Sequence, residues 1–543
     1  MVLAQATRVR AVRRLPPAGL VAAGALVGLA VLLPVAFMTA RSLGAGTEAL
    51  DVLARWRVAG VLARTVALVV IVAAASVSIA VPTAFLTLRT DMPLRRVMAV
   101  ATVLPLVVPS YVAAYVAVAA LGPRGMLQGV LAPLGVERLP EIYGVWGAAL
   151  VMTVISYPYV LLTVRAGMMR MDPALEEASR ALGRSLPRTL WAVTLPLLRP
   201  AIAAGAVLVA LYTLSEFGAV AILRYETFTW AIYTQYEAAF NLQAASSLAS
   251  VLGVLALGIV WLEARTRSRG RYYRSGSGSV RAFVPLRLGR WRWPALAATT
   301  VPVLAGLVAP VGVLVYWLVR GLGRGERLDA VLSPAWHSLW LAGLAAVVTV
   351  VAAVPIALLA VRYPGRVSGL LERVSYLGFA LPGIIVALGL VFVGAKVLGP
   401  LYQTQALLVA GYAIIFVSVA VGALRSSLLQ LNPHIEEAAQ SLGLSSWRTL
   451  VRVTLPLVLP GILAGAALVL LLTMKELPAT LLLRPAGYET LASSVWSAVS
   501  EAFYARAAAP ALVLIIVTGP PTAYLILRDA RRPRASRTGV DPS

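Results

Sequence analysis

The sequence has 543 residues, of which 60% are hydrophobic and only 13% are charged, and its formal net charge is +25. Soluble domains carry about 25% charged residues, so this composition excludes an ordinary water-soluble protein and favours one that lies in lipid. The absence of cysteine excludes disulfides and thiolate metal sites, and the position of the arginines between long apolar runs favours anionic lipid rather than nucleic acid as their partner.

Twelve apolar windows are each long enough for a helix that crosses the hydrocarbon core, which takes about 20 residues. They do not alternate in polarity as the strands of a membrane β-barrel do. The first window follows arginines within residues 8–14, but it is longer than the apolar run of a cleaved signal peptide, so we expect an uncleaved span. We therefore predict an all-α integral membrane protein with about 12 transmembrane helices. The windows are 18–40, 58–88, 97–121, 143–164, 195–223, 244–262, 294–319, 336–361, 374–395, 405–424, 455–483 and 507–527.

Basic residues are unevenly distributed over the segments between these windows. If the N-terminus is cytoplasmic, the inside segments carry more than twice as many Lys and Arg residues as the outside segments. Basic segments stay on the cytoplasmic side, so we expect both termini in the cytoplasm of a bacterial inner membrane. Segment 265–293 is rich in arginine, has no acidic residue and contains a Ser-Gly run at 275–279. It is predicted to be a flexible, basic cytoplasmic linker.

An internal repeat divides the chain. Residues 176–197 read EEASRALGRSLPRTLWAVTLPL and residues 436–457 read EEAAQSLGLSSWRTLVRVTLPL. Such agreement without gaps indicates a duplication. We therefore predict two homologous six-helix halves, at 1–264 and 294–543, with repeated loops near 167–194 and 427–454.

Each repeated loop has the pattern of a short helix, a turn and a second helix. Asp172 and Asn432 each precede a proline, which suits a capping residue followed by the first helical position. Apolar residues then recur at helical spacing and give the first helix one apolar face. The face consists of Leu175, Ala178 and Leu182 in the first copy and Ile435, Ala438 and Leu442 in the second.

The turn and the second helix are marked by further residues. Gly183 and Gly443 follow the first helix, where a left-handed end needs a residue without a side chain. The serines two residues later can cap the second helix, and prolines mark the entry into the next span; these are Ser185, Ser445, Pro196 and Pro456.

An apolar helix face outside the lipid favours docking onto a partner, as in helix-in-groove recognition. The alternative is an interfacial helix that lies on the membrane, which would explain one copy. Two copies, one in each half, favour a two-fold partner such as an ATPase dimer.

The loops resemble the EAA loop of binding-protein-dependent ABC importer permeases. The pattern is Glu-Ala-Ala, three residues, Gly, nine residues, an aliphatic residue, one residue and Leu-Pro, and only Ser179 departs from it. The matching residues are Glu177, Ala178, Gly183, Val193, Leu195 and Pro196, and Glu437, Ala438, Ala439, Gly443, Val453, Leu455 and Pro456.

The resemblance implies that the loops are coupling helices seated on an ABC ATPase dimer at the cytoplasmic side, with Glu177 and Glu437 in contact with it. It also implies an external solute-binding protein. The chain is not expected to be an enzyme, because neither lysine, Lys396 or Lys475, is followed by the Ser or Thr of a P-loop. ATP and Mg²⁺ are therefore expected on the partner, and no cofactor on this chain.

Segments 215–236 and 475–501 each contain a glutamate, then Leu-Arg, then Tyr-Glu-Thr. They resemble the corresponding segments of bacterial ferric iron permeases, which implies ferric iron as the solute. Ferric iron prefers hard oxygen donors, and such donors are present although no firm metal site is predicted. The candidates for a gate or substrate path are Glu216, Tyr225, Glu226, Glu476, Tyr488 and Glu489.

Glu216 and Glu476 fall about 30 Å along a helix from Pro196 and Pro456, so we expect them near the outer ends of their spans, where they can line an external gate. The alternative is a structural role in ion pairs, with Arg224 for Glu216 and with Lys475 or Arg484 for Glu476. Loops 224–243 and 484–506 are expected to help dock the binding protein. His434 is expected at the surface and His337 without a nearby partner, so neither is assigned to a metal.

Other solutes remain open, including thiamine, sulfate, phosphonate and polyamine. A secondary transporter also has internal repeats, but it often carries ionisable residues at mid-span and leaves the repeated loop unexplained. A membrane enzyme is disfavoured because no HExxH and no nucleophile motif beside a triad candidate is present.

Overall fold

The computed structural model describes residues 16–44, 56–267 and 285–531. Within these ranges the chain is helical apart from one isolated β-bridge. Ten helices are long and apolar enough to cross a membrane, and two bent helix pairs raise the number to 12 if each pair counts as one span. The prediction of an all-α protein with about 12 spans is therefore confirmed. Lipid offers no partner to backbone groups, so each span must satisfy its hydrogen bonds internally.

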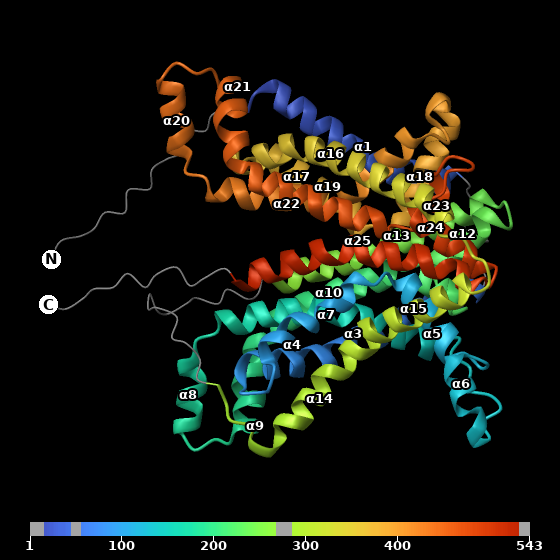
Figure 1. Ribbon diagram of the computed structural model, residues 1–543. Coiled ribbons are helices and arrows are strands. Elements are labelled where there is room, and N and C mark those ends of the chain that lie inside the picture. Colours follow the sequence, from blue (N-terminus) through green and yellow to red (C-terminus); the bar gives the residue numbers. More distant parts are fainter. Residues whose placement is uncertain (1–15, 45–55, 268–284, 532–543) are drawn as a thin grey trace.

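The helices of the two halves follow the same order (Figure 1). The first half contains α1 (Ala18–Gly44), α3 (Trp56–Arg89), α4 (Arg95–Ala101), α5 (Ser110–Leu121), α6 (Met126–Leu131), α7 (Val145–Arg170), α8 (Pro173–Ala181), α9 (Leu186–Thr189), α10 (Leu195–Ser215), α11 (Gly218–Ile222), α12 (Phe228–Glu237) and α13 (Leu242–Arg267). The second half contains α14 (Arg292–Val303), α15 (Ala309–Leu322), α16 (Leu332–Arg362), α17 (Arg366–Ala380), α18 (Gly383–Lys396), α19 (Gln405–Gln430), α20 (Pro433–Ser441), α21 (Ser446–Thr449), α22 (Leu455–Lys475), α23 (Pro478–Leu483), α24 (Leu491–Ser500) and α25 (Tyr504–Arg531).

Two of the predicted spans are sharply bent. The window 97–121 is divided between α4 with a following 3₁₀ turn and α5, at 93°, and the window 374–395 between α17 and α18, at 102°. The breaks fall at Pro109 and Pro382, which have extended backbone and directly precede α5 and α18. Proline lacks the N–H that would continue a helix and disfavours helical conformation in the residue before it. Each of these two windows is therefore a bent helix pair rather than one continuous helix.

The windows 195–223 and 455–483 also overrun the helices. The spans start earlier, at α9 and α21, and end at Ser215 and Lys475, and the remaining residues form the separate short helices α11 and α23. A five-residue π-helix joins the loop helix to the span in each half, Leu190–Thr194 and Leu450–Thr454. Pro196 and Pro456 lie in the first turn beyond it, inside the span rather than at its entry as predicted. Because a proline cannot donate to the preceding turn, a local change of helical pitch accommodates it.

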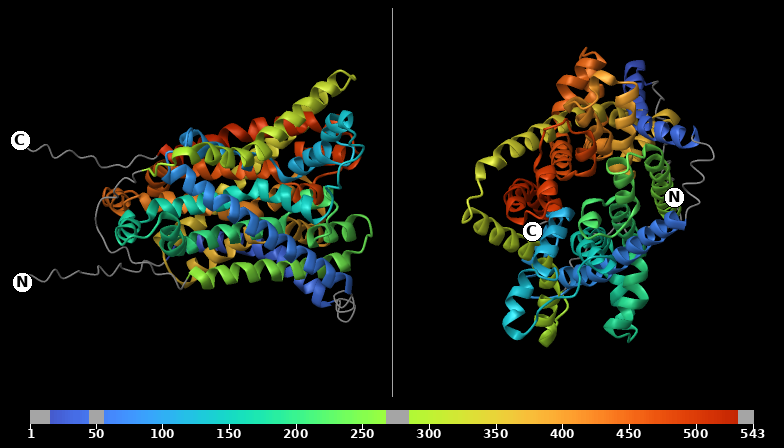
Figure 2. Two further views of the ribbon diagram at one scale, coloured as in Figure 1. Left: turned by 90° about the horizontal axis from the view of Figure 1, so that it is seen from below. Right: turned by 90° about the vertical axis from the view of Figure 1, so that its right-hand side faces the viewer.

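The first span of each half packs against the other half. α1 lies against α16, α17 and α18, and α14 lies against α3 and α4. In the end-on view of Figure 2, α1 (blue) lies beside orange helices of the second half. Glycines permit close contact: a Cβ at Gly389 would lie 2.7 Å from Pro34, and one at Gly306 would lie 2.8 Å from Pro105. The two sequence halves are therefore intertwined in space.

The described end of the linker is fixed to the first half. Leu286 forms a parallel β-bridge with Thr90, and the Asp91 carboxylate accepts a hydrogen bond from the Leu288 N–H at 2.8 Å. At its other end, the predicted linker begins within α13, which continues to Arg267. The described ends of the predicted linker are thus held by a helix and by hydrogen bonds, and the Ser-Gly run at 275–279 lies outside the described residues.

Candidate functional sites: the loop helices and the contact between the halves

The repeated loops form the predicted pair of short helices. The side chain of Asp172 accepts a hydrogen bond from the Ala174 N–H at 3.0 Å, and that of Asn432 accepts one from the His434 N–H at 3.1 Å. Each helix ends before a glycine with left-handed backbone, at φ 80° in Gly183 and φ 87° in Gly443. The capping and turn residues thus have the conformations expected from their types.

The caps of the second loop helices differ. The Ser445 hydroxyl accepts from the Arg448 N–H at 3.4 Å, whereas Ser185 makes no capping hydrogen bond with its side chain. Pro187 occupies the second helical position in the first copy and has no N–H, which removes one of the two usual donors. The prediction of a side-chain cap at Ser185 is therefore wrong.

α8 and α20 project from the same end of the bundle (Figure 1), and their apolar faces are open to solvent. Leu182 is 81% exposed and Leu442 is 87% exposed, and Leu175 and Ile435 are also exposed. Burying one such side chain against a partner stabilises the contact by about 1.5–3 kcal/mol. Ala178, Ala438, Glu177 and Glu437 are exposed on the same two helices. Both apolar faces can therefore contact either a membrane surface or a protein partner.

Sequence reasoning missed the residues that fix these helices to the bundle. Glu176 contacts Arg89 at 3.3 Å and accepts a hydrogen bond from Thr194 at 2.8 Å. Its counterpart Glu436 contacts Arg362 at 3.0 Å and accepts from Thr454 at 2.9 Å. The signal was present in the sequence, because both glutamates and both threonines are identical in the repeat, while each arginine ends the second span of its half.

Ser179, the one departure from the EAA pattern, is buried. Its hydroxyl lies 3.2 Å from that of Thr189 in α9, so it links the two loop helices. The equivalent Ala439 is buried at the same place in the second copy. A small side chain fits here, as expected, and the serine adds a hydrogen bond.

Glu216 and Glu476 directly follow the last residues of α10 and α22. They lie inside the protein rather than at an outer surface: Glu216 is 8% exposed and Glu476 is partly buried. Each carboxylate accepts a hydrogen bond from a backbone N–H three residues later, from Ala219 at 2.9 Å and from Ala479 at 3.2 Å. Both lie at the C-terminal ends of their helices and face the protein interior.

The alternative ion-pair roles for these glutamates are not observed. Among the described residues neither Glu216 nor Glu476 has a basic partner within 4.0 Å. Arg224 instead lies 4.8 Å from the Tyr143 ring centroid. Lys475 donates to the Leu106 carbonyl at 2.9 Å. The carboxylates are therefore buried without a cation in contact.

Lys475 links the two halves at the first bend. Leu106 belongs to the 3₁₀ turn that precedes Pro109, and carbonyls lose their helical partners at such an interruption. We expect Lys475→Met to lower the free energy of unfolding by about 1–3 kcal/mol, because this buried carbonyl loses its donor. The measurement is the thermal unfolding midpoint of the purified chain in detergent. Lys396→Met, at the exposed end of α18, is the matched control and should leave the midpoint unchanged; equal midpoints for both variants would rule out the link.

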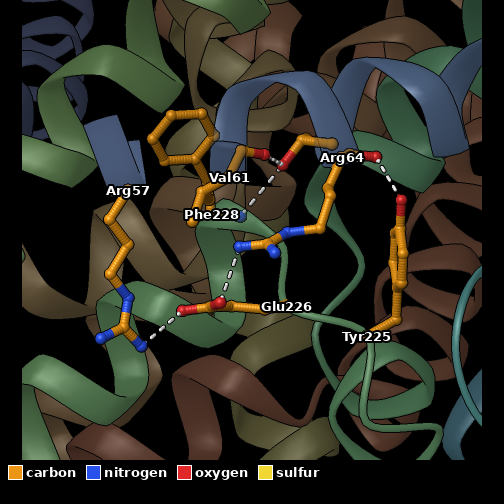
Figure 3. A network of polar contacts seen from close by, with 7 residues as sticks. Arg57, Val61, Arg64, Tyr225, Glu226 and Phe228 are labelled. Atoms are coloured by element: carbon orange, nitrogen blue, oxygen red, sulfur yellow. Dashed lines mark hydrogen bonds and ion pairs between the residues drawn. The ribbon is translucent and has the colours of Figure 1, made fainter. Parts of the chain in front are cut away.

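Tyr225 and Glu226 bind their loop to α3 (Figure 3). Glu226 contacts Arg57 at 3.1 Å and Arg64 at 2.7 Å, and the Tyr225 hydroxyl donates to the Arg64 carbonyl at 3.0 Å. The Phe228 N–H donates to the Thr65 hydroxyl at 3.2 Å. These contacts assign a structural role to the Tyr225–Glu226 pair.

The second half repeats this arrangement with other residues. His337 stacks on Tyr488, with ring centroids 4.0 Å apart, and its Nδ1 lies 2.9 Å from the Glu489 carbonyl. The Glu489 carboxylate accepts from Ser494 at 3.2 Å. The expectation that His337 lacks a nearby partner is therefore wrong, and the ring packs against the loop. His434 is exposed, as expected, and contacts Glu437 at 2.9 Å.

Comparison with known proteins identifies the architecture. The model of the family "Binding-protein-dependent transport system inner membrane component" matches residues 76–262 and 350–527. The Fe(3+)-transport system permease protein FbpB 2 of Haemophilus influenzae is 35% identical over 517 residues, which is 94% of this chain and 98% of that protein. The ferric transport system permease protein FbpB of Actinobacillus pleuropneumoniae is 24% identical, over 81% of this chain and 67% of its own.

A further relative resembles part of the chain. The putative 2-aminoethylphosphonate transport system permease protein PhnV of Salmonella typhimurium is 30% identical over 213 residues, which is 39% of this chain and 78% of that protein. The two family matches coincide with the duplicated halves, and each includes one repeated loop. The chain therefore belongs to the family of binding-protein-dependent transport system inner membrane components, as a duplicated, multi-pass permease subunit of an ABC importer that has no ATPase activity of its own.

Proposed function

We propose that this permease imports ferric iron, which an external solute-binding protein delivers and an ABC ATPase dimer drives into the cytoplasm. The observation that carries the iron assignment is the similarity to an Fe(3+)-transport permease over nearly the whole length of both chains. Oxygen donors are the ligands that hard cations prefer, and the buried carboxylates between the halves offer them.

The ATPase dimer is proposed to dock on α8 and α20. Their exposed apolar faces support this, because two equivalent helices at one end of the bundle suit a two-fold partner (Figure 1). Glu177 and Glu437 would contact that partner, with Ala178 and Ala438 in the apolar face. Gly183 and Gly443 would form the sharp turns, and Pro196 and Pro456 would lead into the spans. ATP and Mg²⁺ would bind to the partner.

This end of the bundle is proposed to be cytoplasmic. The start of α1 and the end of α25 lie there too, which supports cytoplasmic termini (Figure 1). The excess of basic residues in the segments assigned to this side points the same way. The opposite end, with α12 and α24 from loops 224–243 and 484–506, would then receive the binding protein.

Reconstitution tests the proposal. The permease, its ATPase and its binding protein are incorporated into proteoliposomes, and uptake of radioactive ferric iron is measured with and without ATP. We expect uptake only with ATP and loaded binding protein, and no loss when the membrane potential is collapsed. Uptake without ATP would support a secondary transporter, and a binding protein that purifies with an organic solute such as thiamine or a phosphonate would overturn the iron assignment.

A further inference from the structure

The two halves touch where their buried glutamates lie. A Cβ at Gly218, two residues after Glu216, would lie 2.6 Å from the Cβ of Tyr111 and 3.0 Å from Leu477. Leu477 directly follows Glu476 in the other half, so the segments that carry the two glutamates are in contact. One carboxylate from each half therefore faces a shared region.

Three buried hydroxyls in this region have no hydrogen-bond partner among the described residues: those of Tyr111, Thr213 and Thr473. Their residues are 2%, 3% and 4% exposed. Thr213 and Thr473 each precede a glutamate by three residues and so lie near it on the same helix face. An unpaired buried hydroxyl costs about 1–3 kcal/mol. Three of them near two carboxylates therefore indicate oxygen atoms that contact a ligand in another state of the protein.

Tyr111 and Thr473 lie next to the segments that carry the carboxylates. The Cβ of Tyr111 packs against Gly218, two residues after Glu216. Thr473 and Glu476 line one small cavity, together with Tyr412 and Thr480. The second-half oxygen atoms thus share one cavity, and the segment after Glu216 packs against Leu477 next to it.

The bent spans account for carboxylates that are buried without a basic partner. α5 starts at Ser110, and Tyr111 in its first turn packs against Gly218, two residues after Glu216. α18 starts at Gly383, where a Cβ would lie 2.6 Å from the Glu476 Oε1. The N-terminal end of a helix carries partial positive charge, which stabilises a nearby carboxylate. Each sharp bend therefore places a helix N-terminus beside one glutamate.

We infer that Glu216 and Glu476 form a single oxygen-donor site for a hard cation in transit, shared between the halves, with Tyr111, Thr213 and Thr473 as further donors. This inference rests on the proposed function. Within the described ranges no three His, Cys, Asp or Glu side chains are grouped as in a resident metal site. Two carboxylates with neutral hydroxyls suit a cation that must also be released.

The site is closed in this conformation. The cavity beside Glu476 has a volume of about 10 Å³, and even one water molecule needs about 10–15 Å³. A cation can therefore reach Glu476 only when the surrounding helices move, which would couple access to the movement that the ATPase is proposed to drive. Opening of the shared site and movement of the exposed loop helices would then be parts of one transport cycle.

The test uses the assembled transporter in proteoliposomes. Glu216→Gln and Glu476→Gln keep the side-chain size and remove one charge each. Each variant is expected to slow ferric iron uptake roughly 10- to 100-fold, the range for groups that order a metal site. The double variant should be little worse than either single variant, because both remove the same site. ATP hydrolysis stimulated by the loaded binding protein should persist, so that fewer ions move per ATP; loss of hydrolysis together with uptake would instead indicate a structural role and overturn the inference.

Glu141→Gln is the matched control, because Glu141 is an exposed carboxylate that pairs with nearby Arg138 in the loop before α7. It should leave uptake unchanged. Tyr111→Phe should slow uptake less than the glutamate variants, since it removes a neutral donor. Normal uptake by the double variant, or an effect confined to one glutamate, would overturn the shared site. The proposed function would still hold if the wild type showed ATP-dependent iron uptake. A wild type that imports no iron would instead refute the proposed function.

Discussion

Replacing Gly443 with aspartate is expected to reduce ATP-driven uptake at least about tenfold, a loss that needs only ~1.4 kcal/mol. Gly443 has φ 87° at the turn between α20 and α21, and a left-handed backbone costs a residue with a side chain about 1–2 kcal/mol. A Cβ there meets no atom within 4 Å, so the fold itself has room for it. The added charge would lie beside Leu442, on the face proposed to bind the ATPase, where burial of a charge is costly.

The measurements are uptake, the amount of chain in the membrane and the amount of ATPase that co-purifies. Gly443→Asn is the matched control, because asparagine has the size of aspartate, tolerates left-handed backbone and carries no charge. It should retain most of the uptake. We expect Gly443→Asp to insert normally but to bind or respond to the ATPase poorly. Normal uptake by Gly443→Asp would contradict docking at α20.

Arg362→Ala is expected to uncouple ATP hydrolysis from uptake by breaking a contact inside the bundle. Arg362, at the end of α16, contacts Glu436 of α20 at 3.0 Å, and both side chains are less than one-fifth exposed. Loss of one partner leaves a poorly solvated charge, which costs about 2–4 kcal/mol, between the values for surface and buried pairs. α20 would lose its attachment to the span, so that closure of the ATPase dimer would no longer move the second half. Uptake should fall more than about tenfold while ATP hydrolysis continues.

Two comparisons make this prediction specific. Arg327→Ala breaks a pair in which the side chains are 81% and 55% exposed, so it should change uptake and stability little. The double variant Arg362→Met with Glu436→Gln leaves no unpaired charge, and the Thr454 hydroxyl can still donate to the amide oxygen. It should recover part of the lost coupling. A double variant as impaired as the sum of its single variants would show that the pair does not act as a unit.

The loop helices could be predicted from the sequence because their signals are local. Asp172, Asn432, Gly183 and Gly443 act on backbone groups within four residues, and all four have the expected geometry. The spans could be predicted because lipid imposes their length. The repeat then indicated the duplication, and the family matches agree with it.

The remaining features depend on contacts between distant segments. Pro109 and Pro382 lie inside apolar windows, and other prolines, such as Pro158 in α7, are accommodated within a straight helix. Only packing decides which proline becomes a bend. The partner of Lys475 was missed for a similar reason, since Leu106 lies in the other half. The role of Glu176 was not predicted because the family pattern begins one residue later. Its contact with Arg89 also joins residues 87 positions apart, which a local pattern does not indicate.

The exchange of first spans limits how the transporter can move. Because α1 lies against α16, α17 and α18, and α14 lies against α3 and α4, neither half can tilt as an independent body. Each rocking unit must consist of the core of one half and the leading helix of the other. Because α14 and α15 form one continuous span, the polypeptide crosses between the moving units within residues 323–331, before α16. This crossing is a natural pivot, and shortening it would stiffen the motion without altering the loop helices or the buried glutamates.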